Sequence, residues 1–111
     1  MGSVQVISLG GSIIAPDKVD VAFLRAFRKA LLEHLEAEAE RRVILVCGGG
    51  APAREYQGAY RAVLSEGGQF AGEPDAQDWL GIAATRLNAE LVRLLFQPLC
   101  PERVVTDPTA V

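Results

Sequence analysis

The strongest constraint on the fold is an apolar segment that ends in three consecutive glycines. Residues 43–47, VILVC, are almost wholly apolar, as expected for a strand that is covered on both faces of a sheet. Residues 48–50 are all glycine, and Pro52 follows where the first turn of a helix tolerates proline. Glycine loses more backbone freedom on folding than any other residue. Three in a row therefore indicate a sharp turn, or a close approach of something to the backbone.

A second strand-to-glycine segment lies near the start of the chain. Residues 4–9, VQVISL, are rich in β-branched side chains and end at Gly10 and Gly11, so they predict a short strand. In open parallel sheets, ligands bind beyond the carboxyl ends of the strands, and both glycine clusters fall at such ends. If the two strands are neighbours, the clusters face one another.

Helical periodicity and capping residues predict the elements between and after these strands. Asp20 is a good N-cap for a helix whose leucines and phenylalanines recur at helical spacing. The expected elements are helices over 21–40, 52–65 and 78–96, a polar glycine-rich loop over 66–77, and a strand over 103–105. This alternation predicts an α/β fold with a parallel sheet and helices on its faces.

The third expected helix, 78–96, contains several polar residues and an interior glycine. Its apolar stripe is expected to consist of Leu80, Ala84, Leu87, Leu91 and Leu94. Gly81 costs about 1 kcal/mol relative to alanine, which indicates close packing or a nearby ligand. Asp78 ranks first as the helix N-cap, and the alternative is a carboxylate that binds a ribose diol. Arg86 and Asn88 are interpreted as solvated, or as facing a subunit partner.

Composition bounds the class of function. The chain of 111 residues suits one modest domain, and 14 acidic against 11 basic residues give a net charge of -3. This argues against nucleic acid as a main partner, but allows a small phosphorylated ligand. The wide separation of Cys47 and Cys100 makes a metal site or a disulfide framework unexpected. No apolar run approaches membrane-spanning length and no signal peptide is recognisable, so a cytoplasmic protein without membrane contact is expected.

The tri-glycine turn can serve chemistry as well as geometry. Exposed N–H groups at a helix start bind phosphate oxygens, and the missing side chains let a phosphate approach the backbone. Arg54, expected in the first helical turn, can add charge-assisted hydrogen bonds to an oxyanion. The same residues fit a tight strand-to-helix turn with a solvent-exposed arginine, and spacing alone leaves both interpretations open. The segment is neither a Walker A loop nor a GxGxxG motif.

Three sequence blocks occur in a characteristic order over nearly the whole chain. They are VISLGGSIIAP, VILVCGGGAPAREY and DWLGIAATRLNAELV. Together they resemble the amino-acid-kinase superfamily, and within it the uridylate (UMP) kinases of the archaeal type. The resemblance implies an αβα sandwich with a mainly parallel sheet, of which residues 1–111 would form the N-terminal part of a single domain. It also implies transfer of the γ-phosphoryl group of ATP to UMP with Mg²⁺, by a homo-oligomer that is often a hexamer.

The resemblance further implies roles for individual residues. Those implied for the ATP phosphates and the transferred phosphoryl group are Gly11, Ser12, Gly50 and Arg54. For the acceptor UMP the implied residues are Gly49 and, at the ribose, Asp78. No catalytic side chain and no metal ligand is implied within this chain.

Two positions depart from the family pattern. Ser8 stands where many superfamily members carry a lysine, although archaeal UMP kinases also tend to lack it. Ala51 replaces a lysine that often follows the tri-glycine, which removes one cationic phosphate contact. The family's second half, with much of the ATP site, is expected in a missing or separate C-terminal piece, so activity of this chain alone is not expected. The alternatives are a non-catalytic nucleotide- or oxyanion-binding subunit of the same fold, and a purely structural half-domain.

Overall fold

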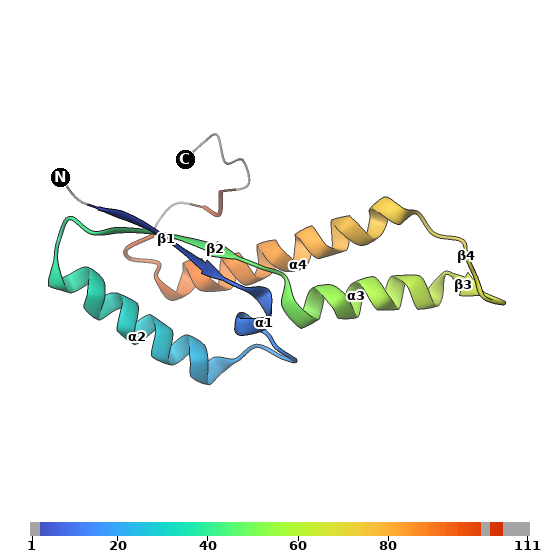
Figure 1. Ribbon diagram of the computed structural model, residues 1–111, viewed down its shortest axis with the longest axis horizontal. Helices are drawn as coiled ribbons and strands as arrows, with labels where there is room; N and C mark the ends of the chain where they lie inside the picture. The colour runs from blue at the N-terminus through green and yellow to red at the C-terminus, as the bar shows by residue number, and fades with distance from the viewer. Residues whose placement is uncertain (1–2, 101–102, 106–111) are drawn as a thin grey trace.

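A computed structural model describes residues 3–100 and 103–105 (Figure 1). The elements are β1 (Val4–Leu9), α1 (Gly11–Ile14), α2 (Val21–Ala37), β2 (Arg42–Cys47), α3 (Gly50–Val63), β3 (Ser65–Glu66), β4 (Gln69–Phe70) and α4 (Pro74–Leu95). The molecule is elongated, with extents of 60 × 33 × 18 Å. Its length arises because α3 and α4 run side by side away from the strands and are joined at the far end by β3 and β4 (Figure 1).

The strands expected over 4–9 and 43–47 are confirmed, and they are parallel neighbours. Val4 lies opposite Arg42 at one end of the pair, and Leu9 lies opposite Cys47 at the other. The carboxyl ends of both strands therefore meet at the same edge of the sheet. This register brings the two glycine clusters together, as their positions at the strand ends predict.

One face of this sheet is covered by helices, and the other is open in the described residues. The strand side chains that pack into the core are Ile7, Leu9, Val43, Leu45 and Cys47. Their buried partners from α2 and from the end of α4 are Leu24, Leu31, Val92 and Phe96. The opposite face exposes Val4, Val6, Ile44 and Val46. The expectation that strand 43–47 is covered on both faces is therefore wrong for the described part of the chain, where no helix packs on that second face.

Helix α2 is confirmed together with its cap, although it ends at Ala37 rather than at residue 40. The Asp20 carboxylate accepts a hydrogen bond from the Phe23 N–H at 2.9 Å, which satisfies one of the unpaired donors at the helix start. Arg28 of this helix donates from Nε to the Leu95 carbonyl at 2.9 Å, so α2 also satisfies an acceptor at the end of α4.

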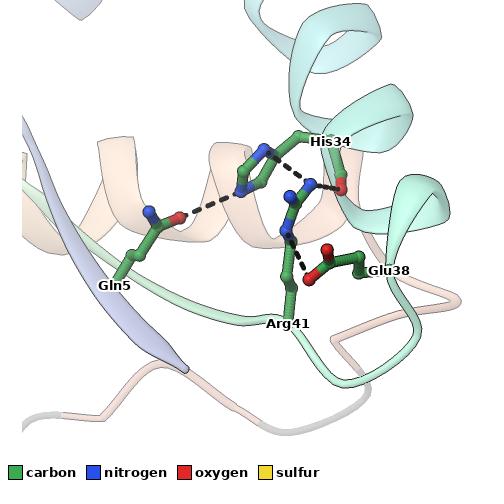
Figure 2. A network of polar contacts seen from close by, with 4 residues as sticks. All are labelled: Gln5, His34, Glu38 and Arg41. Carbon is green, nitrogen blue, oxygen red and sulfur yellow. Dashed lines mark hydrogen bonds and ion pairs between the residues drawn. The ribbon is translucent and has the colours of Figure 1, made fainter. Parts of the chain in front are cut away.

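A polar network ties the C-terminal end of α2 to β1 (Figure 2). Arg41 Nη1 donates to the His34 carbonyl at 2.8 Å and to His34 Nδ1 at 3.2 Å. Because a guanidinium can only donate, His34 Nε2 carries the ring proton and donates it to Gln5 Oε1 at 2.9 Å. Glu38 completes the network by pairing with Arg41 Nε at 3.5 Å.

The segment expected as a loop over 66–77 contains a hairpin and the beginning of α4. Gly67 and Gly68 have φ of 58° and 81°, and two successive positive φ values are the requirement of the tight turn that joins β3 to β4. Helix α4 begins at Pro74, whose missing N–H costs nothing at the first helical position. Asp78 consequently lies beyond the first turn, and its interpretation as the N-cap is wrong.

Three further expectations are corrected by the structure. Helix α3 begins at Gly50 and ends at Val63, so the expected span 52–65 is displaced by two residues. The buried residues of α4 are Ala84, Asn88 and Val92, whereas Leu87 and Leu94 of the expected stripe are 70% and 47% exposed. Residues 103–105, where a third strand was expected, pair with neither β1 nor β2 in the described part of the chain. Within the described ranges, no helix is long and apolar enough to cross a membrane.

The cap of α2 gives a direct test of this fold. Asp20→Ala should lower the free energy of unfolding by about 1 kcal/mol, because the Phe23 N–H loses its acceptor. Asp17→Ala is the matched control, since Asp17 is an exposed carboxylate of the same loop and caps no helix. Urea denaturation followed by circular dichroism measures both. Equal stability of the two variants would contradict the capping role.

Candidate functional site

The two glycine turns contact each other backbone to backbone. A Cβ atom placed on Gly11 would lie 2.0 Å from the Gly50 nitrogen, and one placed on Gly50 would lie 2.2 Å from the Gly11 carbonyl oxygen. One on Gly48 would lie 2.6 Å from the Gly11 nitrogen. Gly50 also has φ of 64°, which L side chains rarely adopt. The fold itself therefore requires glycine at these three positions, before any ligand is considered.

Backbone hydrogen bonds hold both ends of the tri-glycine turn and leave its middle free. The Gly48 N–H donates to the Leu9 carbonyl at 3.1 Å, and the Ala51 N–H donates to the Ala15 carbonyl at 3.0 Å. Between them, the N–H groups of Gly49 and Gly50 donate no backbone hydrogen bond to any residue that the structure describes. Two adjacent N–H groups at the start of α3 thus lack a backbone acceptor among the described residues, and the Gly11 backbone packs against their nitrogens.

Gly49 lies against α4, which lines the other side of the turn. A Cβ on Gly49 would lie 2.8 Å from Ala53 Cβ and 3.0 Å from Thr85 Oγ1. A Cβ on Gly81, one turn before Thr85, would lie 2.8 Å from Gln57 Nε2 of α3. The interior glycine of α4 therefore lies where α3 packs closely, although the atom it would meet is the movable end of the Gln57 side chain.

Asn88 is a buried polar side chain at this contact, and sequence reasoning missed it. Its side chain is 4% exposed, and Nδ2 donates to the Gly48 carbonyl at 2.8 Å and to the Gly49 carbonyl at 3.0 Å. The interpretation of Asn88 as solvated or as facing a subunit partner is wrong. Arg86, by contrast, is exposed on α4.

The remaining predicted site residues lie around the turns with exposed side chains. Ser12 is in α1, and Arg54 is at the start of the second turn of α3, because that helix begins earlier than expected. Asp78 lies on α4 three residues before Gly81, whose carbonyl oxygen would be 3.5 Å from a Cβ on Gly49. The structure thus brings Gly11, Gly49 and Gly50 together, and places Asp78 about one helical turn from the Gly81 end of the contact with Gly49.

Electrostatics favour anion binding over nucleophilic or metal chemistry in this part of the chain. Cys47 immediately precedes the turn, and burial raises the pKa of its thiol, which keeps it protonated and poorly nucleophilic. In the described ranges, no three His, Cys, Asp or Glu side chains gather where they could hold a metal ion. What the geometry offers is a pair of backbone N–H groups followed by the exposed side chain of Arg54.

Both glycine turns lie within a segment that matches a known protein family. The model of the amino acid kinase family matches residues 3–110, which include both glycine turns. The chain belongs to the amino acid kinase family. The resemblance carried by the three sequence blocks is confirmed at this level. The described part of this amino acid kinase chain contains helices and a short parallel sheet, which are features of the expected sandwich.

Several relatives carry the name uridylate kinase. That of Thermofilum pendens is 36% identical over 109 residues, which cover 93% of this chain and 43% of the relative. That of Pyrococcus abyssi is 32% identical over 102 residues, covering 92% and 41%, and that of Thermoplasma acidophilum is 40% identical over 85 residues, covering 76% and 32%. The chain spans about two fifths or less of the length of these curated relatives.

The contact between the glycine turns can be tested by one pair of substitutions in this amino acid kinase. Gly11→Ala should lower the free energy of unfolding by about 1–3 kcal/mol, because the new methyl group would meet the Gly50 backbone. Gly58→Ala is the matched control: nothing lies within 4 Å of its Cβ position, and alanine should stabilise the interior of α3 by about 0.5–1 kcal/mol. Chemical denaturation compares them, and a Gly11→Ala protein as stable as the control would refute the contact.

Proposed function

We propose that this chain forms the phosphate-binding part of a UMP-kinase-like phosphotransferase, which transfers the γ-phosphoryl group of ATP to UMP. The observation that carries the proposal is the pair of free N–H groups of Gly49 and Gly50, followed one turn later by Arg54. The names of the relatives support the choice of reaction. Residues 1–111 would be the N-terminal part of one amino-acid-kinase domain.

In this proposal the chain contributes positioning and charge neutralisation, which are the main requirements of phosphoryl transfer. The Gly49 and Gly50 N–H groups donate to oxygens of the acceptor phosphate and of the transferred group. The guanidinium of Arg54 adds charge-assisted hydrogen bonds on the side of the transferred group. Gly11 and Ser12 approach the ATP phosphates from the opposite turn.

The acceptor side extends along α4 in the same proposal. Asp78 is exposed, and it lies about one helical turn along α4 from Gly81, whose carbonyl oxygen would be 3.5 Å from a Cβ on Gly49. Its carboxylate would accept hydrogen bonds from the ribose hydroxyls. ATP is expected to bring Mg²⁺, which proteins usually hold with carboxylates and substrate phosphates. Because the described part offers no acidic cluster for a metal, we assign no metal ligand and no step to it.

The rest of the enzyme is part of the proposal. The exposed valine and isoleucine side chains on the open face of β1 and β2 suit a further layer of the domain, because parallel sheets are normally covered on both faces. We propose that a C-terminal part, in the same or a separate polypeptide, supplies this layer and the rest of the ATP site. The intact enzyme would assemble as a homo-oligomer, as the family resemblance implies, and light scattering would measure its size.

Ala51 favours a second candidate function. A lysine at this position would place a cation beside the free N–H groups, whereas the alanine contributes only a backbone N–H that is already bonded to Ala15. The chain would then belong to a non-catalytic subunit that binds a nucleotide or another oxyanion. Incubation of the intact protein with ATP, Mg²⁺ and UMP separates the two, since nucleotide binding without ADP and UDP formation identifies the binding subunit.

Arg54 is the residue whose replacement tests the proposed reaction most cleanly. Arg54→Ala should lower kcat/KM for UMP about 100-fold, because a charged donor to the phosphoryl group is lost, while Arg54→Lys should retain part of the activity. The free energy of unfolding of both variants should stay within about 0.5 kcal/mol of that of the unsubstituted protein, since the Arg54 side chain is exposed. A Gly49→Val variant would be less informative, because its side chain would strike Ala53 and Thr85.

Arg25→Ala serves as the control for this experiment, since Arg25 is an exposed arginine of α2. A coupled assay of ADP formation in the intact protein gives the rates. Unchanged kcat/KM in Arg54→Ala would refute the assignment of Arg54 to the phosphoryl group. Absence of UMP turnover in the unsubstituted protein would refute the proposed reaction itself.

A further inference from the structure

The Asn88 amide holds two consecutive carbonyls of a turn that lies 40 residues earlier in the sequence. An asparagine amide has two N–H donors, and here they serve the Gly48 carbonyl at 2.8 Å and the Gly49 carbonyl at 3.0 Å. Asparagine is a poor residue for a helix interior, and a buried polar group is costly unless it is bonded. The site therefore needs an explanation beyond the stability of α4.

The planar geometry of the peptide group supplies an explanation for the buried Asn88. The described residues contain no cis peptide bond, and in a trans peptide the N–H points opposite to the carbonyl of the same plane. With the Gly48 and Gly49 carbonyls directed at Asn88, the N–H groups of Gly49 and Gly50 point away from α4. The Gly11 backbone packs against the same two nitrogens, since a Cβ on Gly11 would lie 2.6 Å from the Gly49 nitrogen and 2.0 Å from the Gly50 nitrogen.

We propose that Asn88 is a positioning residue for phosphate binding: by holding two carbonyls it aims the two adjacent N–H groups at the bound phosphoryl group. This inference rests on the proposed function, and it concerns a side chain that touches no substrate. The turn has no side chains of its own to fix its peptide planes. Without the amide, each plane could rotate and present its carbonyl oxygen, which repels a phosphate.

The substitution Asn88→Leu removes both donors while keeping nearly the same size. In the intact protein it should raise KM for UMP at least about tenfold, the effect expected for losing a hydrogen bond that orients the site. Asn88→Ser retains one hydroxyl donor, so its KM for UMP should lie between those of the unsubstituted protein and Asn88→Leu. It also serves as the test variant if Asn88→Leu does not fold. Val92→Ala is the control, because Val92 is 3% exposed on the same stripe, one turn further along α4. It should lower stability without changing KM.

Nuclear magnetic resonance gives a readout that a purely structural role would not move. Titration of the unsubstituted protein with inorganic phosphate should shift the amide signals of Gly49 and Gly50. The Asn88 variants should lose these shifts at a temperature where they are folded, and Val92→Ala should keep them. Normal shifts and a normal KM in Asn88→Leu would overturn the inference, and so would the absence of shifts in the unsubstituted protein.

The two readouts also separate this inference from the proposed reaction. Phosphate shifts that depend on Asn88, in a protein that does not turn over UMP, would support the positioning role and refute the kinase reaction. UMP turnover that is insensitive to Asn88→Leu would support the reaction and overturn the positioning role.

Discussion

The contact between the Gly11 and Gly50 backbones is the constraint on which the rest of the structure depends. It forms because β1 and β2 are parallel neighbours in a register that brings their carboxyl ends to the same edge. The contact fixes where α3 begins, and Gly49 then meets Thr85 and so determines how closely α4 approaches. A side chain at any of these glycines would separate the strands' ends from the helix pair. The glycines therefore connect the sheet to the α3–α4 pair.

Much of the scaffold could be predicted from the sequence because its signals are local. The strand over 4–9 and the Asp20 cap each depend on a few neighbouring residues, and the adjacency of the glycine clusters follows from where parallel strands end. The sequence also carries local signals for the hairpin and for the start of α4. Gly67 and Gly68 between short polar and aromatic residues indicate a two-residue hairpin, and Pro74 indicates a helix start.

The remaining features depend on contacts that no local pattern encodes. Periodicity alone gave α4 a leucine stripe, but the helix rotates so that Asn88 and Val92 face the turn and the core, while Leu87 is exposed. This orientation of α4 depends on the Gly48 and Gly49 carbonyls, which lie about 40 residues earlier in the sequence and accept hydrogen bonds from Asn88. A mid-helix asparagine within a block of small and apolar residues is the only sequence signal, and it becomes informative once the tri-glycine turn is known to be a neighbour.

Glycines beside a phosphate are commonly explained by the approach of the ligand, but packing already requires them here. The two explanations are compatible, because the packing directs carbonyls toward α4 and leaves adjacent N–H groups unpaired. A kinase and a non-catalytic binding subunit would share that backbone arrangement, so the glycines do not distinguish them. The distinction lies in charge: a phosphoryl group in transfer is stabilised by each cation close to it. In the proposed site Arg54 would supply one cation and Ala51 would not supply a second, so catalysis would depend on whether the rest of the proposed domain compensates at that position.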